Sequence, residues 1–134
     1  MKKTAKDHLN ANKQEKLVVL ENDFAGVKRG QTLFVGTPQI VDKYIKKIPY
    51  GEQRTIIRLR NELARKWKAD AMCPVSTSIF IRIAAQAAID EMEAGKSIDK
   101  VTPFWRLLTS EDKIAKKLTI DKSWIDKQRN SEQG

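Results

Sequence analysis

The sequence predicts a mainly α-helical domain with a small β component. Three stretches with helical spacing of apolar residues lie between residues 37 and 94, two short apolar runs precede them, and an aromatic run follows them. A length of 134 residues suits one domain, and a hydrophobic content of 40% is sufficient for a core. We expect a flexible basic arm over residues 1–16, one domain over 17–129 and a frayed tail over 130–134.

The N-terminal part predicts little regular structure before residue 17. Residues 1–15 are polar and lack valine, isoleucine and aromatic side chains, which is typical of a mobile arm or a weak helix. The runs 17–20 and 31–35 predict two short strands that could pair, because Gly26 and Gly30 supply turns between them.

Two helices are predicted next. Thr37 and Pro38 suit the N-cap and first position of a helix whose apolar residues include Tyr44 and Ile45, and which stops at 49–51. After an extended segment at 53–55, a second helix carries an apolar stripe that includes Leu59. The other members of the two stripes are Ile40, Ile48, Ile56, Leu63 and Trp67.

The third helix is expected to begin at Ser76 or Thr77, either of which could cap it, and to end before Gly95. Its predicted core positions are Phe80, Ile83, Ala84 and Ala87. Residues 104–108 then predict a strand, residues 114–118 a second strand or a loop, and residues 121–129 a short helix with Trp124 facing inward. Three helices followed by a two-stranded ribbon is the order of a winged helix-turn-helix, here preceded by a short N-terminal strand segment.

The charge balance favours an anionic partner. Lys and Arg total 26 against 17 Asp and Glu, which gives a net charge of +9, and such a basic small domain is typical of a nucleic-acid binder. Ordinary solvation of the surface is the alternative. One cysteine and one histidine exclude an intrachain disulfide and argue against a structural zinc site, so no cofactor or metal is expected. No membrane span and no secretory signal are predicted, which favours the cytoplasm.

Three motifs follow one another in the order of a known DNA-repair domain. They are Thr37-Pro38 with a helix ending in Ile48-Pro49-Tyr50-Gly51-Glu52, then Arg54-Thr55 leading to Leu59 and Leu63-Ala64, then Thr102-Pro103-Phe104-Trp105-Arg106-Leu107. Together they resemble the C-terminal domain of the alkylguanine-DNA alkyltransferase (methylated-DNA–protein-cysteine methyltransferase) family, whose active-site motif is Pro-Cys-His-Arg-Val. The resemblance covers about residues 37–129.

The chain departs from this family at the chemical centre. The reactive cysteine falls on Phe104 and its activating histidine on Trp105, so alkyl transfer is not expected and the chain is predicted not to be an enzyme. The tyrosine that helps to rotate the target nucleotide falls on Ile56. The arginine of the recognition helix falls near Ile81 or Arg82, and Arg82 is the candidate. In losing the cysteine, the chain resembles alkyltransferase-like proteins, which bind alkylated guanine and flag it for repair.

The predicted DNA contacts come from three groups of residues. Arg54 and Arg58, in a cluster with further cations at 65, 66 and 68, could bind phosphates, or could form a solvated helix face. The hydroxyls of 76–78 (Ser76, Thr77 and Ser78) and the free N–H groups of the third helix could hold a phosphate, or could cap that helix. The resemblance implies that Arg82 fills the space of an extruded base; a surface arginine is the alternative.

The base pocket is expected around Phe104, Trp105 and Arg106. In a strand, neighbouring side chains point to opposite faces, so one of the two aromatic rings is expected in the core and the other could stack on a flipped base. Core packing of both is the alternative. The resemblance implies that Arg106 anchors the loop.

The leading hypothesis is a non-catalytic, monomeric binder of double-stranded DNA that recognises alkylated or damaged guanine and works with other repair proteins. Alternatives are a plain winged-helix transcription regulator and a protein-interaction domain that kept the fold without DNA binding. An enzyme using Cys73 is the remaining class; that thiol precedes a helix, but His8, the one histidine, lies in the expected arm.

Overall fold

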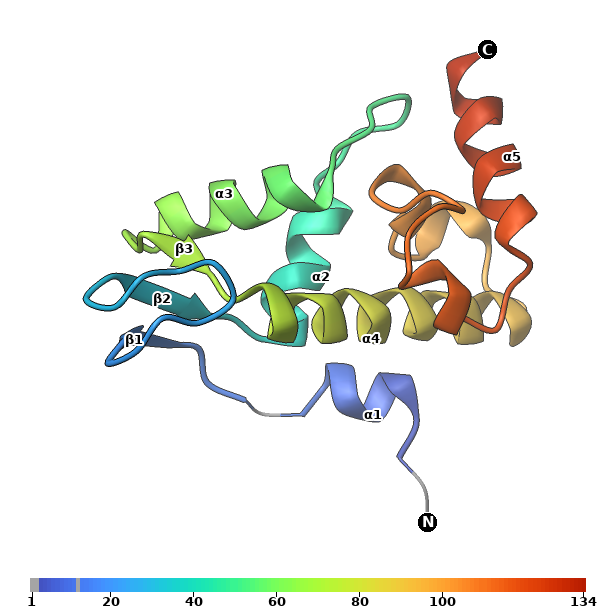
Figure 1. Cartoon of the computed structure of the whole chain (residues 1–134). Coiled ribbons are helices and arrows are strands. Elements are labelled where there is room, and N and C mark those ends of the chain that lie inside the picture. Colours follow the sequence, from blue (N-terminus) through green and yellow to red (C-terminus); the bar gives the residue numbers. More distant parts are fainter. Residues whose placement is uncertain (1–2, 12) are drawn as a thin grey trace.

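A small three-stranded sheet lies at one end of the long helix α4 in the computed structural model, which describes residues 3–11 and 13–134 (Figure 1). Strands β1 (Lys16–Val19) and β2 (Thr32–Val35) pair antiparallel, which confirms the two predicted strands and their pairing. Strand β3 (Ala71–Met72) adds to β2 in parallel and was not predicted. It has only two residues, which is too short for a detectable alternation of apolar side chains.

Three helices form the centre of the molecule, as predicted: α2 (Pro38–Lys46), α3 (Ile56–Lys66) and α4 (Pro74–Glu93). The Thr37 hydroxyl caps α2 by accepting from the Ile40 N–H at 3.2 Å, with Pro38 in the first turn. Thr55 caps α3 in the same way. The predicted cap of the third helix was wrong, because α4 begins at Pro74 with Cys73 as its N-cap residue. The fixed φ of Pro74 favours the first turn of a helix, so the N-cap lies three or four residues before the predicted hydroxyls.

Helices α3 and α4 end in the same hydrogen-bonded motif. After α3, the Ala69 N–H reaches the Ala64 carbonyl at 2.8 Å, and after α4 the Lys96 N–H reaches the Glu91 carbonyl at 2.9 Å. Both motifs need one residue in the left-handed region. At α4 this residue is Gly95, with φ 103°, and at α3 it is Lys68, with φ 57°.

The core lies where the three helices meet. All the apolar residues predicted for α2, α3 and α4 are buried in it or packed against it. Small side chains let α2 and α4 approach closely, since Ala84, Ala85 and Ala88 on α4 are almost fully buried. The core continues past α4 into the aromatic segment that begins at Phe104.

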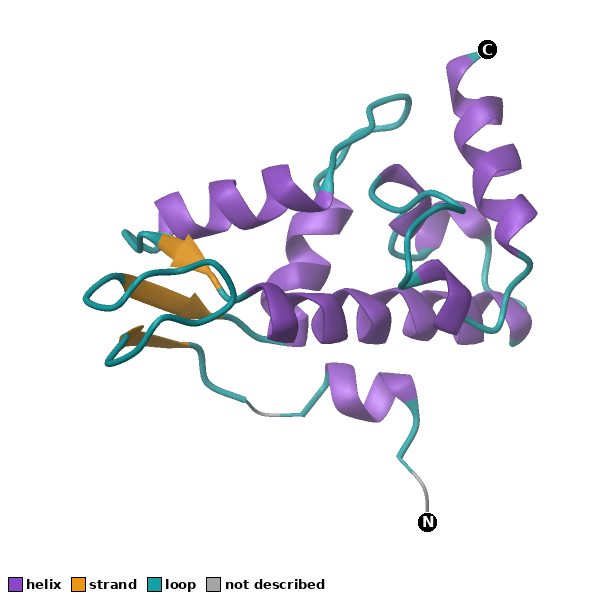
Figure 2. Ribbon diagram, viewed as in Figure 1, coloured by secondary structure: helices purple, strands orange, loops and turns teal. Residues whose placement is uncertain are grey.

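The ribbon predicted over residues 104–118 was wrong. Residues Phe104–Arg106 and Ala115–Lys117 form single 3-10 turns, η2 and η3, after a further turn η1 at Ile98–Lys100, and no described residue beyond β3 is in a strand (Figure 2). The backbone instead bonds locally, with the Arg106 N–H reaching the Pro103 carbonyl at 3.0 Å. The prediction of a mainly α-helical fold with a small β component is confirmed. The strands, however, lie before α2 (β1 and β2) or between α3 and α4 (β3), and not after α4.

The last helix, α5 (Lys122–Gln133), begins at the expected place, with Asp121 as its cap. It runs beyond residue 129, so the expected frayed tail is helical as far as Gln133. At the other end of the chain, α1 (Ala5–Leu9) lies alongside α4 (Figure 1) and carries a capping box between Thr4 and Asp7. The expected arm over 1–16 also includes residues 1, 2 and 12, which lie outside the described residues.

Candidate nucleic-acid interface

Arg54 and Arg58, the first predicted phosphate contacts, are engaged within the protein. Arg54 Nε lies 2.9 Å from Glu52 Oε1, and Arg58 Nε lies 2.6 Å from Glu62 Oε1. The Tyr44 hydroxyl also donates to Glu62, at 2.7 Å. Hydrogen bonds from Arg58 and then from Tyr44 hold the pKa of Glu62 below its usual value. Two guanidinium groups thus face two carboxylates, and this cluster contributes little free positive charge to the surface.

The three hydroxyl residues at the start of α4 do not form a phosphate cradle. Thr77 is fully buried, and its hydroxyl donates to the Cys73 carbonyl at 2.5 Å. The Ser78 hydroxyl donates to the Pro74 carbonyl at 3.0 Å. The Ser76 oxygen is enclosed, and no described group bonds to it. Of the three side chains, that of Ser78 is exposed to solvent.

The outer face of the first half of α4 is exposed and partly apolar. Residues Val75, Ser78, Ile79 and Arg82 recur at helical spacing and are all exposed, with 55% of Val75 and 51% of Ile79 accessible. This face therefore combines exposed apolar side chains with one cation, Arg82. Of the predicted DNA contacts, Ser78 and Arg82 lie on this face.

The segment around η3 brings two lysines to this face. Lys113 and Lys117 line the same shallow hollow, about 230 Å³, as Ser78, Ile79 and Arg82. In the described part of the chain, no carboxylate lies within ion-pair distance of Arg82, Lys113 or Lys117. We call the surface formed by Ser78, Ile79, Arg82, Lys113 and Lys117 the basic face.

Local contacts fix the η3 segment against α4. The Gln86 side chain donates to the Thr119 hydroxyl at 2.6 Å and accepts from the Thr119 N–H at 3.0 Å. Ile114, Ala115 and Leu118 are buried in the core. Sequence reasoning missed Lys113 and Lys117 because the segment was expected to be a strand or a loop. Their spacing of four residues gave no usable signal, because that spacing shares one face in an α-helix, whereas this segment forms a 3-10 turn.

The predicted base pocket is filled by the protein itself. Phe104 and Trp105 are both buried, at 0% and 2% exposure, so both rings pack in the core, which was the alternative expectation. Phe104 stacks on Trp124 with ring centroids 5.8 Å apart, and Trp105 meets both rings edge-on. The Arg106 guanidinium covers the Trp105 ring from 5.8 Å. Neither ring therefore presents an open face to a base.

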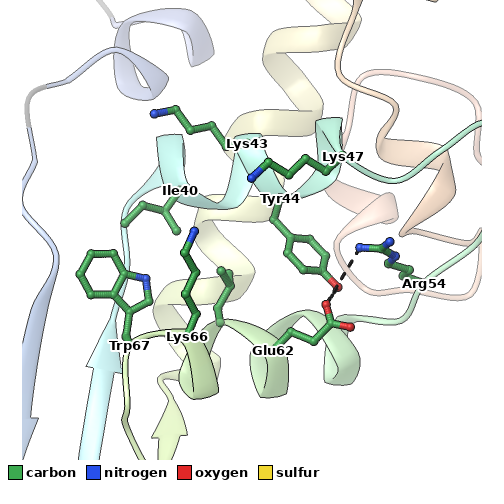
Figure 3. A pocket seen from close by; sticks show the side chains of 9 residues that line it. Ile40, Lys43, Tyr44, Lys47, Arg54, Glu62, Lys66 and Trp67 are labelled. Atoms are coloured by element: carbon green, nitrogen blue, oxygen red, sulfur yellow. Dashed lines mark hydrogen bonds and ion pairs between the residues drawn. The ribbon is translucent and has the colours of Figure 1, made fainter.

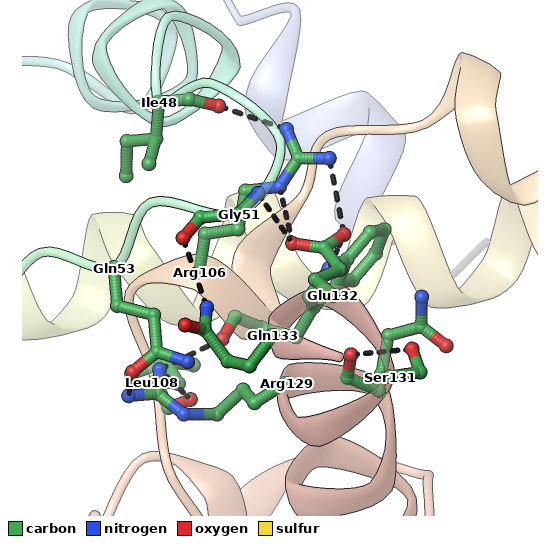
Figure 4. A network of polar contacts seen from close by, with 11 residues as sticks. Ile48, Gly51, Gln53, Arg106, Leu108, Arg129, Ser131, Glu132 and Gln133 are labelled. Carbon is green, nitrogen blue, oxygen red and sulfur yellow. Dashed lines mark hydrogen bonds and ion pairs between the residues drawn. The ribbon is translucent and has the colours of Figure 1, made fainter.

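Arg106 connects three segments around this aromatic cluster (Figure 4). It donates to the Ile48 carbonyl at 2.8 Å and to the Glu132 carboxylate at 3.0 and 3.1 Å. Trp105 Nε1 donates to the same carboxylate at 2.8 Å. Before the turn, the buried Thr102 hydroxyl donates to Asp42 on α2 at 2.6 Å. The segment that resembles an alkyltransferase active site is thus a structural junction in this chain.

Cys73 is buried at the start of α4 and is the one cysteine of the chain. His8 lies on α1 and is exposed. No three side chains among the described residues gather histidine, cysteine or carboxylate groups in a way that could hold a metal ion. Of the helices that the structure describes, none is both long and apolar enough to cross a membrane.

Comparisons with known proteins give no independent assignment. A scan against protein-family models, a search of curated proteins and a search of solved structures each found no match. The resemblance to alkylguanine-DNA alkyltransferases therefore stays a prediction from the sequence motifs.

Proposed function

We propose that the chain is a non-catalytic binder of duplex DNA, and that it contacts DNA through the basic face. The observation that carries this proposal is the grouping of Arg82, Lys113 and Lys117, from two distant segments, without carboxylate partners in the described structure. When cations contact phosphates, they displace counterions condensed on the DNA, and this release is a large source of affinity for DNA. The net charge of +9 supports the same partner.

The proposed mode places α4 in a groove, as the recognition helix of a helix-turn-helix domain does. The exposed apolar residues Val75 and Ile79 would contact bases or sugars, while Arg82 and the two lysines would contact the backbone. Recognition of alkylated guanine is not part of the proposal, because the rings of Phe104 and Trp105 are covered by Trp124 and Arg106.

Fluorescence anisotropy with a labelled duplex tests this proposal. The triple variant Arg82→Gln, Lys113→Gln, Lys117→Gln should reduce the dependence of log affinity on log salt by about 0.9 for each phosphate that the protein no longer neutralises. A control triple, Lys16→Gln, Arg29→Gln, Lys127→Gln, removes the same charge from exposed residues elsewhere and should change the dependence much less. Equal effects of the two triples would reject the basic face as the binding surface.

The same assay separates the competing functions. We expect equal affinity for matched duplexes with and without one methylated guanine, since no base pocket is open. A clear preference for the methylated duplex would restore the lesion recognition that the sequence resemblance implies. Absence of binding to either duplex at physiological salt would reject DNA binding and favour a protein-interaction domain.

A further inference from the structure

A pocket opens between α2 and α3, away from the residues of the basic face (Figure 3). Its volume is about 450 Å³, which falls in the range of small-molecule sites. Trp67 lies at one end, and Arg54 with Glu62 lies at the other. No residue lines both this pocket and the hollow beside Arg82.

The lining carries an excess of positive charge. Lys43, Lys47 and Lys66 reach the pocket from both helices, and none of them has a carboxylate partner within the described residues. The one carboxylate in the lining, Glu62, already accepts hydrogen bonds from Tyr44 and from Arg58, which lies outside the pocket. A ligand that suits this lining therefore carries negative charge.

The end at Trp67 is apolar and contains an unsatisfied donor. Ile40 and Leu63 line it beside the indole, whose ring stacks on Phe34 at a centroid distance of 5.0 Å. The Trp67 Nε1 atom is enclosed, and no described group accepts a hydrogen bond from it. Figure 3 shows the nitrogen-bearing edge of the indole facing the pocket. A buried donor without a partner is costly, so an acceptor on a ligand would be stabilised here.

We infer that this pocket binds a small phosphorylated ligand with a planar aromatic group, the chemistry of a nucleoside monophosphate. The phosphate lies between Lys47 and Lys66, and the aromatic group lies against the apolar end, where a ring nitrogen or carbonyl accepts from Trp67. This site is separate from the proposed DNA contact and does not depend on it.

Isothermal titration calorimetry with adenosine 5′-monophosphate tests the inference, with adenosine and inorganic phosphate titrated separately. The nucleotide should bind more tightly than either of its parts. Lys47→Gln with Lys66→Gln should weaken it about a hundredfold, since two charge-assisted hydrogen bonds are removed. Trp67→Phe keeps the stacking on Phe34 and should weaken binding about fivefold by removing one neutral donor. The control pair Lys16→Gln with Lys127→Gln, both exposed and outside the pocket, should bind as the parent does.

The lysine variants keep the test decisive if Trp67→Phe fails to fold, because Lys47 and Lys66 are exposed. No binding of the nucleotide at millimolar concentration overturns the inference. It is also overturned if the lysine pair leaves the affinity unchanged, or if phosphate alone binds as tightly as the nucleotide. Binding of a single-stranded oligonucleotide with the same lysine dependence, but without mononucleotide binding, would likewise overturn it and assign the pocket to a polymer.

Discussion

Arg106 and Glu132 are joined by two hydrogen bonds across 26 residues of sequence, from Nε to Oε1 at 3.0 Å and from Nη2 to Oε2 at 3.1 Å. Trp105 Nε1 donates to the same carboxylate. Glu132 is buried on the last turn of α5. Its carboxylate accepts from Trp105 and Arg106 of the η2 turn and from the Gly51 N–H in the loop after α2. This carboxylate therefore joins α5 to both of the other segments, beside the hydrogen bonds that Arg129 makes to the Trp105 and Leu108 carbonyls.

Replacing Glu132 with alanine should lower the free energy of unfolding by about 2–4 kcal/mol, because the partly buried Arg106 charge and the buried Trp105 N–H lose their acceptor. Urea denaturation followed by circular dichroism measures the change. Glu111→Ala, at an exposed carboxylate of the same type, serves as the control and should change the stability by less than about 0.5 kcal/mol. Similar stabilities for the two variants would mean that the junction is not formed in solution.

The pH dependence of stability should carry the signature of the same carboxylate. Burial alone raises the pKa of Glu132, but hydrogen bonds from Arg106 and Trp105 outweigh it, so the pKa lies below its ordinary value of 4.5. A lowered pKa in the folded state means that stability is present above about pH 4.5 and is lost as the pH falls through the folded pKa.

Glu132→Gln should therefore lower the free energy of unfolding most near neutral pH, and progressively less as the solution is acidified. Denaturation of both proteins between about pH 3 and 7 measures the difference. The variant should still lose some stability in acid, because the pKa of Asp126 is also lowered, by its hydrogen bonds from Ser110. If the difference in free energy of unfolding between the two proteins does not change with pH, the pKa of Glu132 is not lowered in the folded state.

The two matching helix ends allow a paired test of backbone strain. Lys68 adopts φ 57° at the end of α3, which costs a lysine about 1 kcal/mol and costs glycine nothing. Lys68→Gly should therefore stabilise the fold by about 0.5–1 kcal/mol, and Gly95→Ala, at φ 103° after α4, should destabilise it. Thermal unfolding should show a higher Tm for Lys68→Gly and a lower Tm for Gly95→Ala than for the parent. A lower Tm of Lys68→Gly would contradict the prediction.

The thiol of Cys73 should be unreactive in the folded protein. Its side chain is buried, and the buried Thr77 hydroxyl bonds to the Cys73 carbonyl beside it. A disulfide reagent such as dithionitrobenzoate should react slowly under native conditions and rapidly in denaturant. Rapid modification of the native protein at neutral pH would instead favour the alternative of an enzyme that uses this cysteine.

The elements with local signals were predictable from the sequence. Thr37 and Pro38 start α2 where a cap and a proline predict it, and Gly95 follows α4 as a terminating glycine should. The start of α4 differs from the prediction because Pro74 occupies the first turn and no side-chain hydroxyl caps this helix. The partner of Arg58 was also open to prediction, since Arg58 and Glu62 are spaced four residues apart on one helix.

The segment after α4 was not predictable in the same way. The run at 104–108 has the composition of a strand, but its conformation depends on partners far away in sequence. Trp105 bonds to Glu132, and Thr102 bonds to Asp42, 60 residues earlier. Without a neighbouring strand to pair with, the tertiary contacts override the local preference. The position of Lys113 and Lys117 beside Arg82 depends on the same long-range packing, so it could not be predicted from the local sequence either.

The dependence of the aromatic cluster on α5 has a consequence for shortened forms of the protein. The strands and the three central helices are complete by residue 93, but Trp124, which stacks on Phe104, and Glu132, which accepts from Trp105, both lie on α5. A chain that is cut before α5 would expose large aromatic rings, the type of surface that chaperones bind and that promotes aggregation. Proteolytic removal of the last helix would therefore turn a folded domain into a substrate for chaperones.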